Sequence, residues 1–113
     1  MRLARAAETL LVGEGIETSM SAMQAMAMPA WAALSTSGLK VLMLPVIVRT
    51  VVILADNDKN GAGKRAAHAA AERWLAEGRH VRIAMPPEPG RELNDVLLGR
   101  ARVGIKEGHR VAT

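Results

Sequence analysis

An unbroken run of apolar residues, Thr50 to Ala55, limits most strongly what this chain can fold into. A strand with one solvent-exposed face alternates apolar and polar residues, but this run has no polar residue after its first position. Such a run is typical of a strand that is buried on both faces in the middle of a parallel sheet. Because Asp56 follows at once, the same strand also delivers a carboxylate to the edge of that sheet.

Further strands and helices are expected on both sides of this run. The remaining strands are predicted at Thr9 to Gly13, Trp31 to Leu34 and Arg79 to Met85. Helices are predicted from Thr18 or Ser19 to about Met28, Gly38 to Leu44, Ala62 to Glu77 and Leu93 to Leu98. Strands that alternate with helices indicate right-handed βαβ crossovers. We therefore expect an α/β, Rossmann-like fold with about four mainly parallel strands flanked by helices.

Length and composition limit the classes of protein to which the chain can belong. Its 113 residues suit one domain over 1–113, with a core from about 9 to 99 and a basic tail over 100–113. The absence of cysteine excludes a disulfide scaffold or a zinc ribbon. The apolar runs are too short to span a bilayer, so we expect a cytoplasmic protein without a membrane partner. The net charge of +4 suits an anionic partner such as nucleic acid.

Three carboxylates are expected at one edge of the predicted sheet. Glu14 follows the first strand, and Asp56 and Asp58 follow the third. Ligands of open parallel sheets bind at the carboxyl ends of the strands. Carboxylates gathered there repel one another, and a divalent cation removes that repulsion. Magnesium prefers a few carboxylates together with water and phosphate oxygens, so the three acids predict a magnesium site.

Two alternatives remain open for the residues that follow the third strand. Asp56 and Asp58 can also shape a turn and cap the helix that begins at Ala62. Lys64 and Arg65, at the start of that helix, can contact phosphates or form a solvated first turn.

Two motifs in this order resemble the Toprim domain that primases, topoisomerases, small nucleases and recombination-repair proteins share. The first is LLVGEGIET, which contains Glu14, and the second is VVILADNDKNGAGKRAA, which contains Asp56 and Asp58. The resemblance implies that Glu14 is a general acid/base or a metal ligand, and that the two aspartates bind the metal. Lys59-Asn60 are two residues more than the primase-type DxDxAG segment has.

Shorter matches favour the primase branch of that family. The segment LSTSG resembles the turn after the second primase strand, and GRELNDVL resembles a G-K-D-x-N-D stretch of phage and plasmid primase-helicases. Asp95 in the second segment is thereby implied as a further metal ligand, whereas Glu92 replaces the first acid of that stretch.

The resemblance implies Mg²⁺-dependent phosphodiester chemistry on nucleic acid, with Mn²⁺ as the alternative ion. The first expectation is the nucleotidyltransferase domain of a DNA primase or primase-helicase, which makes RNA primers from nucleoside triphosphates. A helicase or other domains of a larger replication protein are the expected further partners. The alternatives are a Toprim nuclease and a non-catalytic module that binds nucleic acid or acts in recombination.

Overall fold

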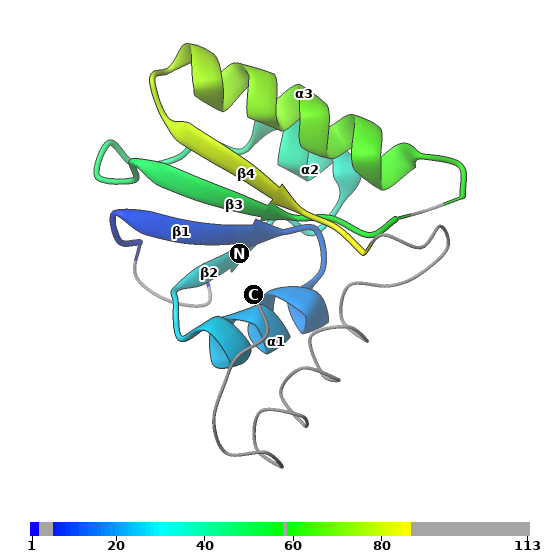
Figure 1. Ribbon diagram of the computed structural model, residues 1–113, viewed down its shortest axis with the longest axis horizontal. Coiled ribbons are helices and arrows are strands. Elements are labelled where there is room, and N and C mark those ends of the chain that lie inside the picture. The colour runs from blue at the N-terminus through cyan, green and yellow to red at the C-terminus, as the bar shows by residue number, and fades with distance from the viewer. Residues whose placement is uncertain (3–5, 58, 87–113) are drawn as a thin grey trace.

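The chain forms a four-stranded parallel sheet in the computed structural model, which describes residues 1–2, 6–57 and 59–86 (Figure 1). The strands are β1 (Thr9–Gly13), β2 (Ala30–Ala32), β3 (Thr50–Leu54) and β4 (His80–Ala84). Their order in the sheet is β2-β1-β3-β4, and each neighbouring pair is parallel. The predicted α/β fold is confirmed, and β3 lies inside the sheet as its apolar run requires. The expected helix at Leu93 to Leu98 and the tail over 100–113 lie outside the described residues.

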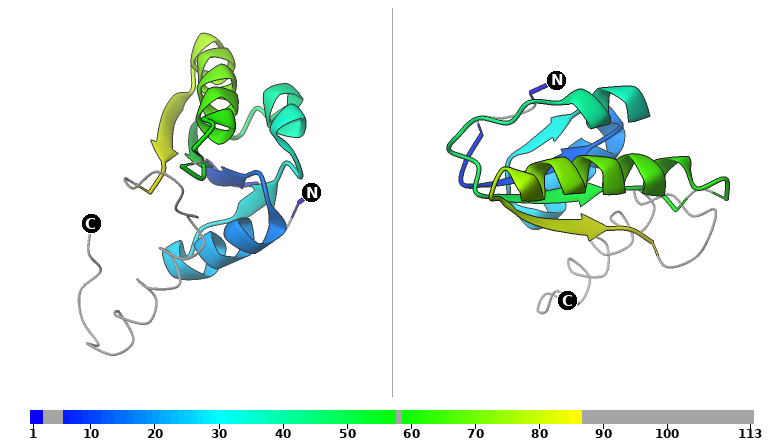
Figure 2. Two further views of the ribbon diagram at one scale, coloured as in Figure 1. Left: turned by 90° about the vertical axis from the view of Figure 1, so that its right-hand side faces the viewer. Right: turned by 90° about the horizontal axis from the view of Figure 1, so that it is seen from above.

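Helices cover both faces of this sheet. They are α1 (Ile16–Met26), α2 (Thr36–Val41) and α3 (Ala62–Ala76). As Figure 2 shows, α2 and α3 lie together on one face and α1 lies on the other. No helix in the described ranges is long and apolar enough to cross a membrane.

The main core lies between the sheet and the α2–α3 layer. Side chains that alternate along the strands point into it, among them Leu10, Val12, Val51 and Ile53, and α3 contributes the fully buried Trp74. The intervening strand residues Leu11, Ala30 and Leu54 face α1 and form a smaller second cluster with Ala22 of that helix. Burial on both faces explains why β1 and β3 carry no alternating polar positions.

The longest helix, α3, packs closely because its inner stripe consists mainly of alanine. Ala66 and Ala70 are buried against the sheet, followed one turn later by Trp74. Glycines in the left-handed region lie at both ends, with φ values of 76° at Gly61 and 90° at Gly78. The predicted helix from Ala62 to Glu77 therefore agrees with the observed element within one residue.

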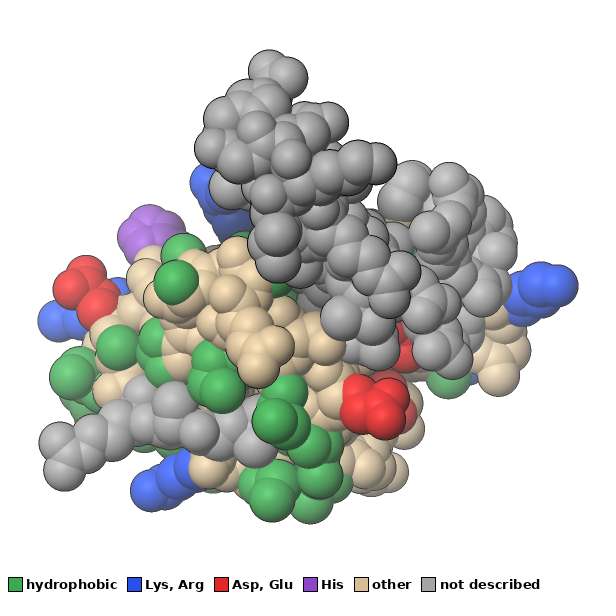
Figure 3. Space-filling model, turned by 90° about the horizontal axis from the view of Figure 1, so that it is seen from below, with side chains coloured by type: hydrophobic (Ala, Val, Ile, Leu, Met, Phe, Trp, Pro, Cys, Tyr) green, Lys and Arg blue, Asp and Glu red, His purple; other side chains and the backbone are tan. Residues whose placement is uncertain are grey.

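The predicted start of α1 was wrong. Its N-cap is Gly15, and Ser19 lies inside the helix with its side chain fully buried. The Ser19 hydroxyl donates a hydrogen bond of 2.8 Å to the Gly15 carbonyl oxygen and lies 3.3 Å from that of Trp31. The residues of α1 that face the sheet, Ser19 and Ala22, are small. The larger Ile16, Met20 and Met26 are exposed. Figure 3, a view of the α1 side, shows hydrophobic side chains at that surface.

The second strand and the following helix also begin earlier than expected. The strand ends at Ala32, because Leu34 has a left-handed backbone with φ 74° and cannot continue it. Ser35 then caps α2, its hydroxyl accepting a 2.8 Å hydrogen bond from the Gly38 amide. A Cβ at Gly38 would overlap the Ala33 carbonyl oxygen, so glycine allows α2 to start this close to β2.

Candidate functional site

The register of β1 and β3 brings two of the predicted acids to one edge of the sheet. Gly13 pairs with Leu54 at the carboxyl ends of these neighbouring strands. Glu14 follows Gly13 directly, and Asp56 comes two residues after Leu54. Adjacent strands in a sheet lie about 5 Å apart. Both carboxylates therefore leave the same edge of the sheet from adjacent strands, and both side chains are only partly buried.

Backbone hydrogen bonds hold this edge beyond the ends of the strands. The Glu14 carbonyl oxygen accepts a 2.6 Å hydrogen bond from the Leu34 amide, so pairing with the β2 side continues past Gly13. On the other side, the Ala55 amide donates a 2.9 Å hydrogen bond to the Ala84 carbonyl oxygen. The chain positions that carry Glu14 and Asp56 are thus fixed by the sheet.

Two asparagines for which the sequence reasoning predicted no role, Asn57 and Asn60, order the loop between β3 and α3. The Asn57 side-chain amide donates a 2.8 Å hydrogen bond to the Pro86 carbonyl oxygen, which ties the loop to the end of β4. The Asn60 side-chain oxygen accepts a 3.0 Å hydrogen bond from the Ala62 amide at the start of α3. Asn60 therefore gives the additional Lys59-Asn60 pair a structural role. An asparagine before a glycine at a helix start was the available signal.

The first turn of α3 carries two basic residues, Lys64 and Arg65, and both are exposed. An Arg65 guanidinium nitrogen donates a 2.8 Å hydrogen bond to the Asn60 carbonyl oxygen, so this side chain braces the loop. Both lie at the N-terminal end of α3, where the helix dipole favours an anion.

The described part of the predicted metal site consists of Glu14 and Asp56. Asp58 and Asp95 lie outside the described residues, and within those residues no group of three or more acidic or histidine side chains could hold a metal ion. The two described side chains offer hard oxygen atoms from partly buried positions, and this donor type fits Mg²⁺.

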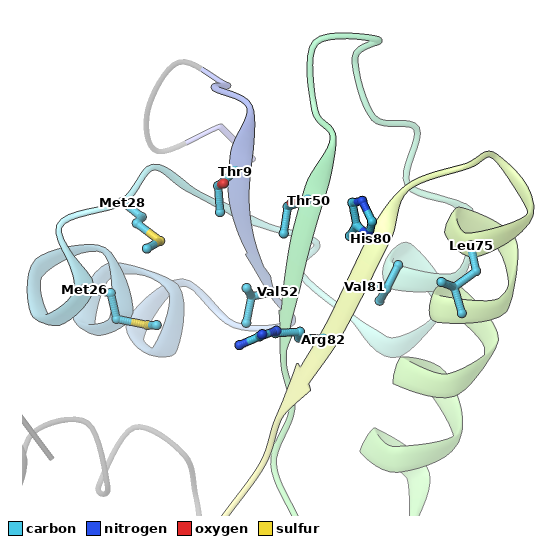
Figure 4. A pocket seen from close by; sticks show the side chains of 9 residues that line it. All are labelled: Thr9, Met26, Met28, Thr50, Val52, Leu75, His80, Val81 and Arg82. Carbon is cyan, nitrogen blue, oxygen red and sulfur yellow. The ribbon is translucent and has the colours of Figure 1, made fainter. Parts of the chain in front are cut away.

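A cavity of about 570 Å³ lies elsewhere on the sheet. Its lining includes Thr9, Thr50 and His80, which are the first residues of β1, β3 and β4. Figure 4 shows Met26 and Met28 on one side of it, facing the strands. It lies toward the amino ends of the strands, so it does not coincide with the acidic edge that follows their carboxyl ends.

Comparisons with known proteins agree with this architecture. A family model described as Toprim domain matches residues 9–102. Among solved structures, the chain is similar to a DNA primase domain from Pseudomonas aeruginosa, with 24% sequence identity and a TM-score of 0.58. That match covers 88% of this chain and 33% of the other, so the chain spans about a third of the primase domain's length. None of the curated proteins matches the chain.

Proposed function

This chain belongs to the Toprim family, and from that premise we propose that it is the catalytic domain of a DNA primase or primase-helicase. Its reaction would be Mg²⁺-dependent nucleotidyl transfer on nucleic acid. The observation that carries the proposal is the parallel register Gly13–Leu54, from which Glu14 and Asp56 leave one edge of the sheet. We also propose that residues 1–113 are a single Toprim unit, with its core over about 9–99.

Each acid has a role in this proposal. Asp56 and Asp58 would hold the metal, and Glu14 would act as a general acid/base or a further ligand. Asp95 is proposed as an additional ligand. Mg²⁺ or Mn²⁺ bound there would stabilise negative charge on a phosphate group. The chain's own part is to hold these carboxylates in place, and hydrogen bonds on both sides of the edge support this for Glu14 and Asp56.

Electrostatics favour a cation at this edge. Like charges that leave one edge of a sheet from adjacent strands disfavour each other. Glu14 and Asp56 are partly withdrawn from water, which weakens the screening of their charges. A divalent ion held by both carboxylates would attract each of them.

The surroundings of the acids suit a phosphate-bearing substrate. The N-terminal end of α3 follows the Asp56 loop, and Lys64 in its first turn is exposed. We propose that Lys64, with Arg65 as a second contact, faces the phosphates of a nucleoside triphosphate or a nucleic acid strand. A helicase or other domains of a larger cytoplasmic replication protein would be further partners.

Primer synthesis tests the proposal directly. Purified chain is incubated with single-stranded DNA, labelled ribonucleotides and Mg²⁺. Asp56→Asn should lower synthesis by about 100-fold or more. Glu72→Gln, an exposed acid on α3, is the matched control and should leave it unchanged. Metal-dependent DNA cleavage that requires Asp56, without primer synthesis, would identify a nuclease instead. Nucleic-acid binding without either activity would identify a non-catalytic module.

A further inference from the structure

An apolar segment at the end of α2 faces solvent. Residues 41–47 comprise the last residue of α2 and most of the connection to β3 at the amino edge of the sheet, and the right-hand view of Figure 2 shows this connection. Four of its aliphatic side chains are largely exposed: Val41 (70%), Met43 (74%), Val46 (89%) and Ile47 (59%). Single exposed aliphatic residues are normal, but four within seven residues form a patch that calls for a physical reason.

The most exposed pair lies at the tip of a tight turn. The Val48 amide donates a 3.1 Å hydrogen bond to the Pro45 carbonyl oxygen, which makes Val46 and Ile47 the two central residues of a β-turn. Central turn positions usually hold glycine, asparagine, aspartate or proline. Two β-branched aliphatic residues at these positions do not favour the turn conformation, so we infer that a contact with another molecule explains them.

Core packing and hydrogen bonds from Arg79 fix the backbone of this segment. Leu42, Leu44 and Val48 alternate with the exposed residues and pack into the main core. The Arg79 guanidinium donates hydrogen bonds to the carbonyl oxygens of Val48 (2.9 Å), Leu44 (3.1 Å) and Pro45 (2.9 Å). The exposed side chains are therefore presented on a fixed backbone, and little conformational entropy would be lost when they are covered.

Charge at the border of the patch narrows the choice of what covers it. Lys40 precedes the segment and Arg49 follows it, and both are exposed. Near them, Glu77 is paired with Arg79, and Glu8, whose carbonyl oxygen accepts a hydrogen bond from the Arg49 amide, is exposed. Positive charge therefore exceeds negative charge at this border, which disfavours the approach of a second copy through the same segment. Of the cations at this segment in the described residues, Arg73 and Arg79 donate to its backbone carbonyl oxygens, and Lys40 and Arg49 are exposed. Two exposed cations are fewer than the roughly 4–8 that electrostatic attachment to an anionic membrane uses.

We propose that residues 41–47 are a docking site for a partner protein. The partner would offer an aliphatic pocket rimmed by carboxylates, which would receive Val46 and Ile47 and face Lys40 and Arg49. The site lies at the amino edge of the sheet, so an occupant would leave Glu14 at the carboxyl edge accessible. It is independent of whether the acids catalyse primer synthesis.

Selection from a random-peptide phage library tests the docking site. Peptides are selected on the wild-type chain and counter-selected on the double variant Val46→Asp/Ile47→Asp. We expect enriched sequences that combine aliphatic residues with Asp or Glu. Their affinity should fall about 10-fold or more on the double variant. The control Met20→Asp changes an exposed aliphatic side chain on the opposite face and should bind them like the wild type.

A second variant keeps the test independent of the folding of the first. Lys40→Glu/Arg49→Glu leaves the aliphatic tip intact and should weaken the same peptides several-fold, with relief at high salt. The proposal is overturned if no sequence is enriched, or if enriched peptides bind the double variant equally. Self-association through the segment in sedimentation experiments, or segment-dependent binding to phosphatidylserine vesicles, would also overturn it.

Discussion

Gly13 at the end of β1 lies directly against Ser19 of α1. A Cβ built at position 13 would lie 2.5 Å from the Ser19 side-chain oxygen, closer than such atoms approach in proteins. Ser19 in turn is fully buried and linked to the Gly15 carbonyl oxygen. Because Glu14 is the next residue after Gly13, this contact sets how α1 leaves the sheet beside the proposed metal ligand.

Replacement of Gly13 by alanine should therefore destabilise the fold. The added methyl group overpacks a buried contact, and we expect a loss of about 1–3 kcal/mol in the free energy of unfolding. Urea denaturation measures this loss. Gly15→Ser is the control, because a Cβ at Gly15 meets no atom within 4 Å and serine is a favoured N-cap. Equal destabilisation by both substitutions would contradict the account.

A double-mutant cycle isolates the Gly13–Ser19 contact. Ser19→Ala removes the oxygen that the new methyl group would meet, after which the nearest atom would be a Leu54 carbon at 3.5 Å. The double variant should lose at least about 1 kcal/mol less than the sum of the single variants. Strict additivity would mean that the clash lies elsewhere.

Asn60 should contribute to stability without taking part in chemistry. Its side-chain oxygen accepts a hydrogen bond from the Ala62 amide, so Asn60→Ala should cost about 1 kcal/mol in thermal or urea denaturation. Asn60→Asp keeps an accepting oxygen and should cost less. The exposed neighbour Lys59 serves as the control, since Lys59→Ala should change stability by no more than about 0.5 kcal/mol. A larger effect at Lys59 than at Asn60 would refute this role of the Asn60 side chain.

Arg79 should be a structural arginine. Its side chain is 11% exposed and donates to carbonyl oxygens of the connection between α2 and β3. Arg79→Met should lower the free energy of unfolding by about 2–4 kcal/mol, because these oxygens lose their donor. Arg82→Met, on the exposed side of β4, should stay within about 0.5 kcal/mol of the wild type. Similar losses of stability in Arg79→Met and Arg82→Met would contradict a structural role for Arg79.

The elements with strong local signals could be predicted from the sequence. The unbroken apolar run of β3 and the alanine stripe of α3 each follow from one physical rule, and both were correct within one residue. The parallel direction of the strands followed from their alternation with helices. The rule that parallel strands end at one edge then predicted that Glu14 and Asp56 share an edge, whereas the pairing of β1 with β3, which makes the two residues neighbours, was not predicted.

Features set by tertiary contacts could not be predicted in this way. Ser19 looks like a helix cap in the sequence, but a close approach of α1 to β1 buries it inside the helix. The connection over residues 42–49 depends on Arg79, about thirty residues later, and no local pattern reports such a pairing.

A magnesium titration followed by NMR tests the central claim most directly. The claim is that Glu14 and Asp56, from adjacent strands, belong to one metal site. The amides around both residues should shift together at millimolar Mg²⁺ with a single apparent Kd, and EDTA should reverse the shifts. Asp56→Asn should remove the response at Glu14 as well, whereas Glu72→Gln should not. No shift at either residue, or shifts at Asp56 that leave Glu14 unmoved, would contradict the account.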